Sequence, residues 1–136
     1  MASIIRELTL EVNADVAWSA VRRVDEVHTK LVPGLVSRVT LESGVRHVVF
    51  ASGLEIDELI VAVDEDSRRL VYAVQNRAKH HQASMQVVTE GRDRSRLIWI
   101  TDVLPQEAAS RFANIMDQAL PIIKRTIEST ENTVVS

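Results

Sequence analysis

The chain has 136 residues and a mass of 15.2 kDa, with 46% hydrophobic residues, 26% charged residues and a net charge of −3 at pH 7. This balance predicts one globular domain over residues 1–136, with no global attraction to nucleic acid or to an anionic membrane. The absence of cysteine excludes disulfides, thiol nucleophiles and thiolate metal sites. No apolar run reaches the roughly 18–20 residues that cross a bilayer, and the first residues lead directly into a strand pattern. We therefore expect a cytoplasmic protein with no integral membrane association.

The N-terminal part predicts a strand followed by a helix. Leu8, Leu10 and Val12 alternate with polar residues, which is typical of a half-buried strand. Apolar residues then recur at helical spacing from Ala17 to Leu31, until Pro33-Gly34 ends the segment. The sequence therefore predicts a single helix over this stretch.

From Leu35 onward the period of the apolar residues changes to two. Short polar breaks separate runs rich in Val, Ile and Leu, so each run is expected to pair with the next in a meander. No segment is long enough for a βαβ crossover, which favours an antiparallel sheet. The expected strands are Val36–Glu42, Arg46–Ala51, Leu54–Val63, Leu70–Val74, Ser84–Glu90 and Leu97–Leu104.

The C-terminal segment predicts one long amphipathic helix that begins near Pro105 and carries its apolar residues in one stripe. Pro121 lies inside this pattern and is expected to kink the helix or to free a carbonyl locally. About 24 residues at ~1.5 Å per residue reach ~36 Å, enough to span a sheet. One helix laid across a strongly curved sheet does not fill its concave side, so we expect a cavity between them.

The segment Arg46 to Asp66 reads RHVVFASGLEIDELIVAVDED and is followed by Arg69-Leu70-Val71-Tyr72. It resembles the central region of the SRPBCC superfamily, which includes START lipid-transfer domains and polyketide cyclase/dehydrase-like proteins. The resemblance implies an α+β helix-grip fold, in which a seven-stranded curved antiparallel sheet wraps around a long C-terminal helix. Ser52-Gly53-Leu54 is distantly similar to the gate loop of plant abscisic-acid receptors, but Glu55-Ile56-Asp57 follow here instead of Pro-Ala.

Glu58 is the strongest candidate for chemistry. The resemblance implies that it faces the pocket together with Ile56 and Ile60. Desolvation there would favour the neutral carboxyl, which could bind a ligand hydroxyl or act as a general acid or base. The alternatives are an ion pair with a neighbouring arginine such as Arg46, or a position at the solvent rim. The catalytic residue, if there is one, is therefore unknown, with Glu58 as the best candidate.

The resemblance aligns Tyr72 with an aromatic residue that lines the pocket of related proteins, although a core tyrosine fits the sequence equally well. The adjacent His80 and His81 are expected in a solvated loop, but alternation with Ala83 and Met85 would turn His81 toward the pocket mouth. The full set expected to bind the ligand is Val48, Phe50, Ile56, Glu58, Tyr72, Val74, His81, Met85, Phe112, Ile115 and Met116.

Trp99 lies out of phase with Ile98 and Ile100, and the sequence leaves open which set faces inward. If the Ile98 set faced inward, Asp102 could form a carboxylate pair with Glu58. Adjacent histidines on an extended segment point to opposite sides and do not share one ion. No metal and no cofactor are expected.

Three functions remain open from the sequence. The leading hypothesis is the binding of a small hydrophobic or amphipathic molecule, such as a lipid, isoprenoid or polyketide, in the internal cavity. The second is a polyketide cyclase or aromatase-like enzyme that uses Glu58 as acid or base. The third is a protein-interaction domain with a filled interior and no ligand. A homodimer is compatible with all three.

Overall fold

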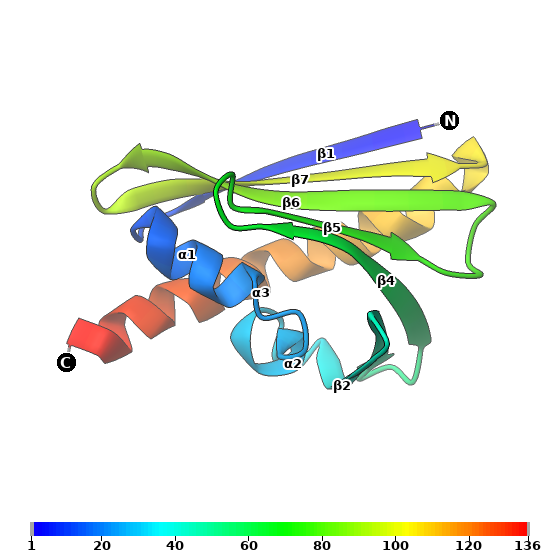
Figure 1. Cartoon of the computed structure of the whole chain (residues 1–136), viewed down its shortest axis with the longest axis horizontal. Coiled ribbons are helices and arrows are strands. Elements are labelled where there is room, and N and C mark those ends of the chain that lie inside the picture. The colour runs from blue at the N-terminus through cyan, green and yellow to red at the C-terminus, as the bar shows by residue number, and fades with distance from the viewer. Residues whose placement is uncertain (1, 136) are drawn as a thin grey trace.

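The computed structural model describes the backbone of residues 2–135 and the side chains of residues 2–130. Strands of this part form a seven-stranded antiparallel sheet in the order β1-β7-β6-β5-β4-β3-β2 (Figure 1). This arrangement confirms the expected fold class. The strands are β1 (Ala2–Leu10), β2 (Val36–Glu42), β3 (Val45–Phe50), β4 (Glu55–Asp64), β5 (Arg69–Val74), β6 (His80–Gly91) and β7 (Arg94–Leu104).

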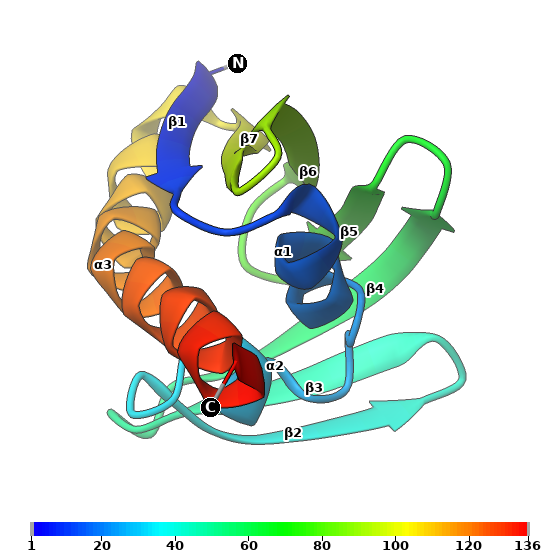
Figure 2. The same cartoon turned by 90° about the vertical axis from the view of Figure 1, so that its left-hand side faces the viewer.

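The sheet curves into an arc, and the helices lie on its concave side. Figure 2 shows the arc from one end, with α3 along the open side of the arc and α1 across the near end. The buried stripe of α3 faces the sheet and consists of Phe112, Met116, Ala119, Ile123 and Ile127. The helical segments are α1 (Ala14–Val21), α2 (Val27–Lys30), the 3₁₀ turn η1 (Gln106–Ala108) and α3 (Ala109–Val135).

The prediction of a single first helix is wrong, because α1 and α2 are separate. After Val21 the backbone N–H of Val24 bonds to the carbonyl of Arg22 at 3.0 Å, so the α-helical hydrogen-bond ladder is broken there. The chain then turns and forms the short helix α2. Apolar periodicity continues across this break, which is why the sequence pattern did not reveal it.

Three strands, β1, β6 and β7, begin several residues earlier than predicted, because the added residues pair with a neighbouring strand of the sheet. β1 begins at Ala2, which lies opposite Val103 of β7. β6 begins at His80, opposite Leu104, so the two histidines belong to a strand and the expectation of a solvated loop is wrong. α3 runs continuously through Pro121, which is exposed on its outer side.

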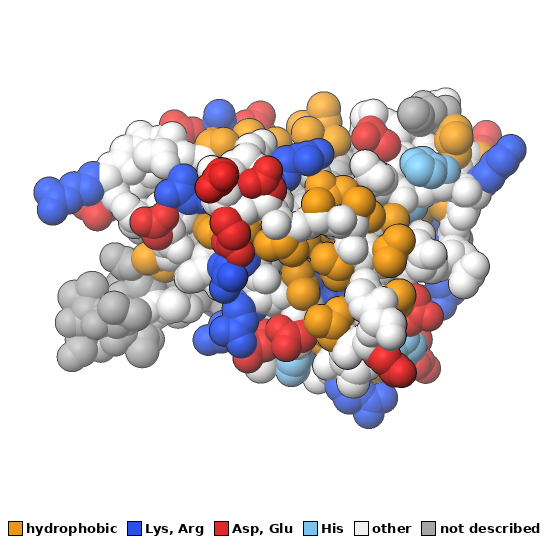
Figure 3. Space-filling view, in the orientation of Figure 1, with side chains coloured by type: hydrophobic (Ala, Val, Ile, Leu, Met, Phe, Trp, Pro, Cys, Tyr) orange, Lys and Arg blue, Asp and Glu red, His pale blue; other side chains and the backbone are white. Residues whose placement is uncertain are grey.

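The outer surface carries a group of exposed apolar residues on β4. Leu59, Val61 and Val63 are 39%, 50% and 39% exposed. Figure 3 shows hydrophobic side chains gathered near the centre of the face on which β4 and β5 lie in Figure 1. No helix of the described residues combines the length and the apolar character that crossing a membrane requires.

Candidate functional site

A cavity of about 70 Å³ lies between the concave face of the sheet, the segment around α2 and the middle of α3. We call it the α2 cavity, because Val27 and Leu31 form part of its wall. Most of its lining is apolar. Its polar groups come from Arg46, Glu58 and the rings of Tyr72 and Trp99.

A second cavity of about 40 Å³ lies toward the N-terminal end of α3. We call it the His81 cavity, and its wall includes Thr101, Phe112 and Met116. The cavities are adjacent because they share four wall residues, namely Phe50, Glu58, Tyr72 and Ile115.

Every residue of the expected ligand-binding set lines one of these cavities. Alternation along the strands selected Val48, Phe50, Val74, His81 and Met85, whereas the family resemblance placed Ile56, Glu58 and Tyr72. Their role in binding a ligand stays a prediction. The α2 cavity is lined by Val48, Phe50, Glu58, Tyr72, Met85 and Ile115, and the His81 cavity adds Ile56, Val74, His81, Phe112 and Met116.

Glu58 forms a nearly buried ion pair with Arg46. This is one of the alternatives that the sequence left open for Glu58. The two residues lie opposite each other across β3 and β4. Nε and Nη2 of Arg46 each lie 2.7 Å from Oε1 of Glu58, and the side chains are 5% and 13% exposed. Arg46 also donates from Nη1 to the carbonyl of Val24 at 3.1 Å. The guanidinium is thereby held by a carboxylate and a backbone carbonyl, which compensates its removal from water.

Tyr72 is at the centre of the polar groups in the cavities. Its ring centroid lies 5.1 Å from Cζ of Arg46, and its hydroxyl accepts a hydrogen bond from Nε1 of Trp99 at 3.1 Å. Burial raises the pKa of the Tyr72 hydroxyl, and the charge of Glu58 raises it further. The hydroxyl therefore stays protonated at neutral pH and can donate its proton to an acceptor in the cavity.

The buried position of Trp99 shows which face of β7 points to the core. Trp99 and Thr101 face the core, whereas Ile98, Ile100 and Asp102 lie on the other face of the strand. Asp102 accepts a hydrogen bond from Oγ of Ser3 at 2.5 Å on that outer face. The paired carboxylates considered for Glu58 and Asp102 are therefore absent.

His81 faces inward from β6, as the alternation suggested, while His80 is exposed. Nδ1 of His81 accepts a hydrogen bond from the backbone N–H of Val74 at 3.0 Å. The imidazole centroid lies 4.7 Å from that of Phe112. Burial lowers the pKa of His81 to about 4, so the ring is neutral at pH 7. Among the described residues, no group of three or more His, Asp or Glu side chains has a geometry that could hold a metal ion.

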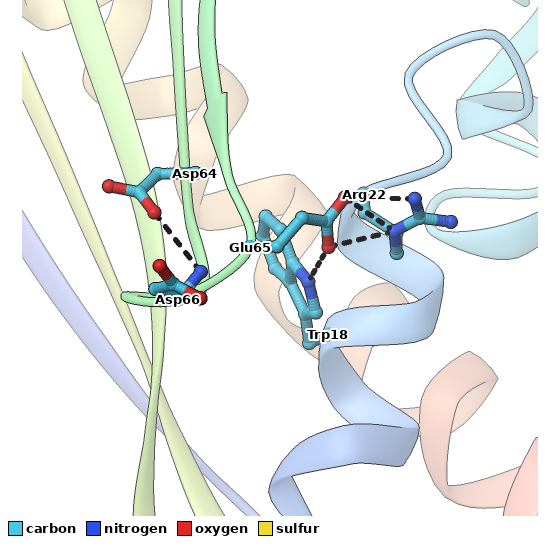
Figure 4. Close-up of polar contacts among 5 residues, drawn as sticks. All are labelled: Trp18, Arg22, Asp64, Glu65 and Asp66. Carbon is cyan, nitrogen blue, oxygen red and sulfur yellow. Dashed lines mark hydrogen bonds and ion pairs between the residues drawn. The ribbon is translucent and has the colours of Figure 1, made fainter.

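The turn between β4 and β5 is anchored to α1 (Figure 4). Nε1 of Trp18 donates to Oε1 of Glu65 at 2.7 Å, and Nη2 of Arg22 lies 2.8 Å from Oε2 of the same carboxylate. The hydrogen bonds from Arg22 and Trp18 lower the pKa of Glu65. Asp64 shapes the turn by accepting the backbone N–H of Asp66 at 3.1 Å. These contacts hold α1 against the sheet next to the α2 cavity.

Sequence reasoning placed Trp99 and Arg46 in the interior only as alternatives and missed Thr101. The signal was present, because Arg46 precedes Val48 by two residues and Thr101 follows Trp99 by two, which puts each pair on one face of a strand. The contribution of Val27 and Leu31 was hidden by the wrong prediction of one continuous helix.

The chain matches no protein-family model and no curated protein sequence. Its fold is shared with solved structures. XoxI from Bacillus cereus superposes with a TM-score of 0.85 at 18% identity, over 96% of this chain and 99% of that chain. Norcoclaurine synthase from Thalictrum flavum, solved with dopamine and hydroxybenzaldehyde, gives a TM-score of 0.76 at 18% identity, over 97% of this chain and 87% of that chain.

The di-domain ARO/CYC protein BexL from the BE-7585A biosynthetic pathway gives a TM-score of 0.78 at 13% identity, over 94% of this chain and 47% of that chain. These similarities, together with the curved sheet and the long C-terminal helix, establish the helix-grip fold. At this level of identity they establish the fold alone.

Proposed function

We propose that the protein binds a small hydrophobic or amphipathic molecule in the α2 and His81 cavities. The observation that carries the proposal is the shared wall: Glu58 and Tyr72 place polar groups at the junction of cavities that are otherwise mainly apolar. Apolar walls with a few convergent polar groups are typical of small-molecule sites.

The volumes set the size of the ligand. Cavities of about 70 and 40 Å³ hold a few waters and are together smaller than the ~150 Å³ apolar cavity that binds benzene. Even a one-ring compound therefore requires a small adjustment of the wall. A lipid, isoprenoid or polyketide requires part of the wall to move.

The segment around α2 is the part of the wall best suited to move. α2 has four residues, none of them buried, and its N-cap makes no side-chain hydrogen bond. Short helices without such caps have little stability of their own. α1 is anchored to the β4–β5 turn through Glu65. A larger ligand would therefore enter by displacing α2.

A second candidate is an aromatase or cyclase-like enzyme that acts in the same cavities. It is favoured by the position of Glu58 and the protonated hydroxyl of Tyr72, which both cavities share. In this case Glu58→Gln would strongly reduce turnover while affinity for the substrate stays close to that of the wild type. Equal turnover in the variant would remove the enzymatic candidate.

The test of binding is native mass spectrometry of the purified protein, followed by denaturing extraction and a thermal-shift screen of small apolar compounds. Ala119 is buried and lines the α2 cavity, so Ala119→Leu should fill the cavity and reduce binding. Ala113→Leu on the same helix is the matched control, because Ala113 is partly buried outside both cavity walls. An apo mass with no stabilising compound, or equal binding by both leucine variants, would contradict the proposal.

A further inference from the structure

The hydrogen bond to His81 determines where its ring carries a proton. The backbone N–H of Val74 is a donor, so Nδ1 of His81, 3.0 Å away, must be the unprotonated acceptor. The ring is neutral at pH 7, and a neutral imidazole has one proton. This proton therefore lies on Nε2.

Nε2–H is a donor without a partner among the described residues. Two other polar side chains nearby already make one hydrogen bond each. Thr101 donates to Sδ of Met116 at 3.3 Å, and the Tyr72 hydroxyl accepts from Trp99. His81 itself lines the cavity beside Phe112. The His81 cavity thus offers two donors to a molecule that enters it, the Nε2–H of His81 and the hydroxyl proton of Tyr72, and only the first belongs to this cavity alone.

The charges in the walls cancel. Of the described side chains that line the cavities, Arg46 and Glu58 alone are charged at pH 7, and they neutralise each other at 2.7 Å. A ligand with a net charge would lose its hydration without gaining a counter-charge, which is strongly unfavourable.

We propose that the site selects an uncharged molecule with a carbonyl oxygen, which accepts the Nε2–H of His81 while its hydrocarbon part extends toward the α2 cavity. This inference rests on the proposed binding function and specifies its ligand class. It excludes carboxylates such as fatty-acid anions.

The test compares three probes built on one benzene ring, namely acetophenone, ethylbenzene and benzoate, by isothermal titration calorimetry at pH 7. One hydrogen bond to the ketone should make the Kd of acetophenone about tenfold lower than that of ethylbenzene. Benzoate should bind at least tenfold more weakly than acetophenone, although it also has acceptor oxygens. Benzoate binding as tightly as acetophenone would overturn the inference.

Two substitutions of His81 distinguish the roles of its two ring nitrogens. His81→Asn places an amide oxygen near the position of Nδ1, which keeps the bond from Val74 and removes the donor. His81→Gln places an amide N–H near the position of Nε2 and keeps the donor. The ratio between the Kd values of ethylbenzene and acetophenone should fall to about one in His81→Asn and stay near ten in His81→Gln. The exposed neighbour provides the control, and His80→Asn should keep the full ratio.

The outcomes distinguish this inference from the proposed function. Binding of ethylbenzene and acetophenone with equal Kd by the wild type, or an unchanged ratio in His81→Asn, would overturn the ligand class and leave the binding function in place. A wild-type protein that binds none of the probes, and that carries no ligand in native mass spectrometry, would overturn both.

Discussion

Arg46 and Glu58 face each other across neighbouring strands, and two guanidinium nitrogens lie 2.7 Å from a single carboxylate oxygen. The pair is nearly buried and borders both cavities, so it contributes to stability and to the polarity of the site. Removing one partner of such a pair leaves a buried charge without compensation.

Glu58→Gln should therefore lower the free energy of unfolding by about 3 kcal/mol, measured by urea denaturation. Glu42→Gln, at an exposed position on β2, should change it by less than about 0.5 kcal/mol. The double variant Arg46→Met with Glu58→Leu should be more stable than Glu58→Gln, because it removes both charges. A Glu58→Gln variant as stable as the Glu42 control would contradict the assignment.

The bond between Trp99 and Tyr72 gives a second prediction. Tyr72→Phe removes the acceptor and leaves the buried indole N–H unpaired, which should cost about 1–2 kcal/mol of stability. A double-mutant cycle with Trp99→Phe separates this bond from the loss of packing. We expect a coupling energy of about 1 kcal/mol, and a value near zero would show that the bond contributes nothing.

His81 should make the protein sensitive to acid. Its pKa is about 4 in the folded state, below its ordinary value, so the unfolded chain binds more protons between pH 6.5 and 4. The contribution of neutral His81 to the free energy of unfolding is fully present above pH 6.5 and decreases as the pH falls through this window. From pH 7 to 4 the wild type should lose ~3 kcal/mol more than His81→Asn, which keeps the contact with Val74. Parallel urea-unfolding profiles for the two proteins would refute this expectation.

His47 should have the opposite pH dependence. Its ring nitrogens lie 2.6 Å from Asp57 and 2.8 Å from Glu55 on the outer face of the sheet. Hydrogen bonds to these carboxylates raise the pKa of His47, and the bond to Asp57 has the largest effect. Its contribution is complete below the ordinary histidine pKa and is lost as the pH rises through the folded-state value. The difference in Tm between wild type and His47→Gln should thus shrink between pH 6 and 9, and a constant difference would exclude this role.

Glu65 gives a test of the contact between α1 and the β4–β5 turn. Because Arg22 and Trp18 lower its pKa, its contribution is present above its ordinary pKa and is lost as the pH falls through the folded-state value. The Tm of Glu65→Gln should be below that of the wild type at pH 7, and the two should converge on acidification below about pH 4. Asp66→Asn in the same turn is the control and should show no such convergence.

The strands that alternate locally were predictable, and so were the inward positions on β3 and β6. β2 spans the predicted residues Val36–Glu42, and the inward positions of Val48 and Met85 follow from a period of two. Glu58 and Arg46 could be suspected as a pair because they flank one hairpin. This part of the structure depends on interactions between residues close in sequence.

What escaped prediction depends on distant parts of the chain or on single backbone bonds. The N-terminal extension of β1 exists because residues 2–7 pair with β7, which no local pattern reveals. The break between α1 and α2 comes from the turn at Val24. The orientation of β7, with Trp99 inward, required the register itself, since both faces of the strand carry large apolar residues.

The pairing of β1 with β7 also determines the order in which the protein can fold. Ala2 lies opposite Val103, so β1 is synthesised well before β7, the strand with which it pairs. Until β7 has been synthesised, the nascent chain contains β2 to β6 as a meander whose contacts are mostly local. Pairing β1 with β7 then closes a loop that extends from Leu10 to Ser95, and such non-local contacts slow folding. During this interval the backbone of β1 is an unpaired strand that is exposed to other chains and to chaperones.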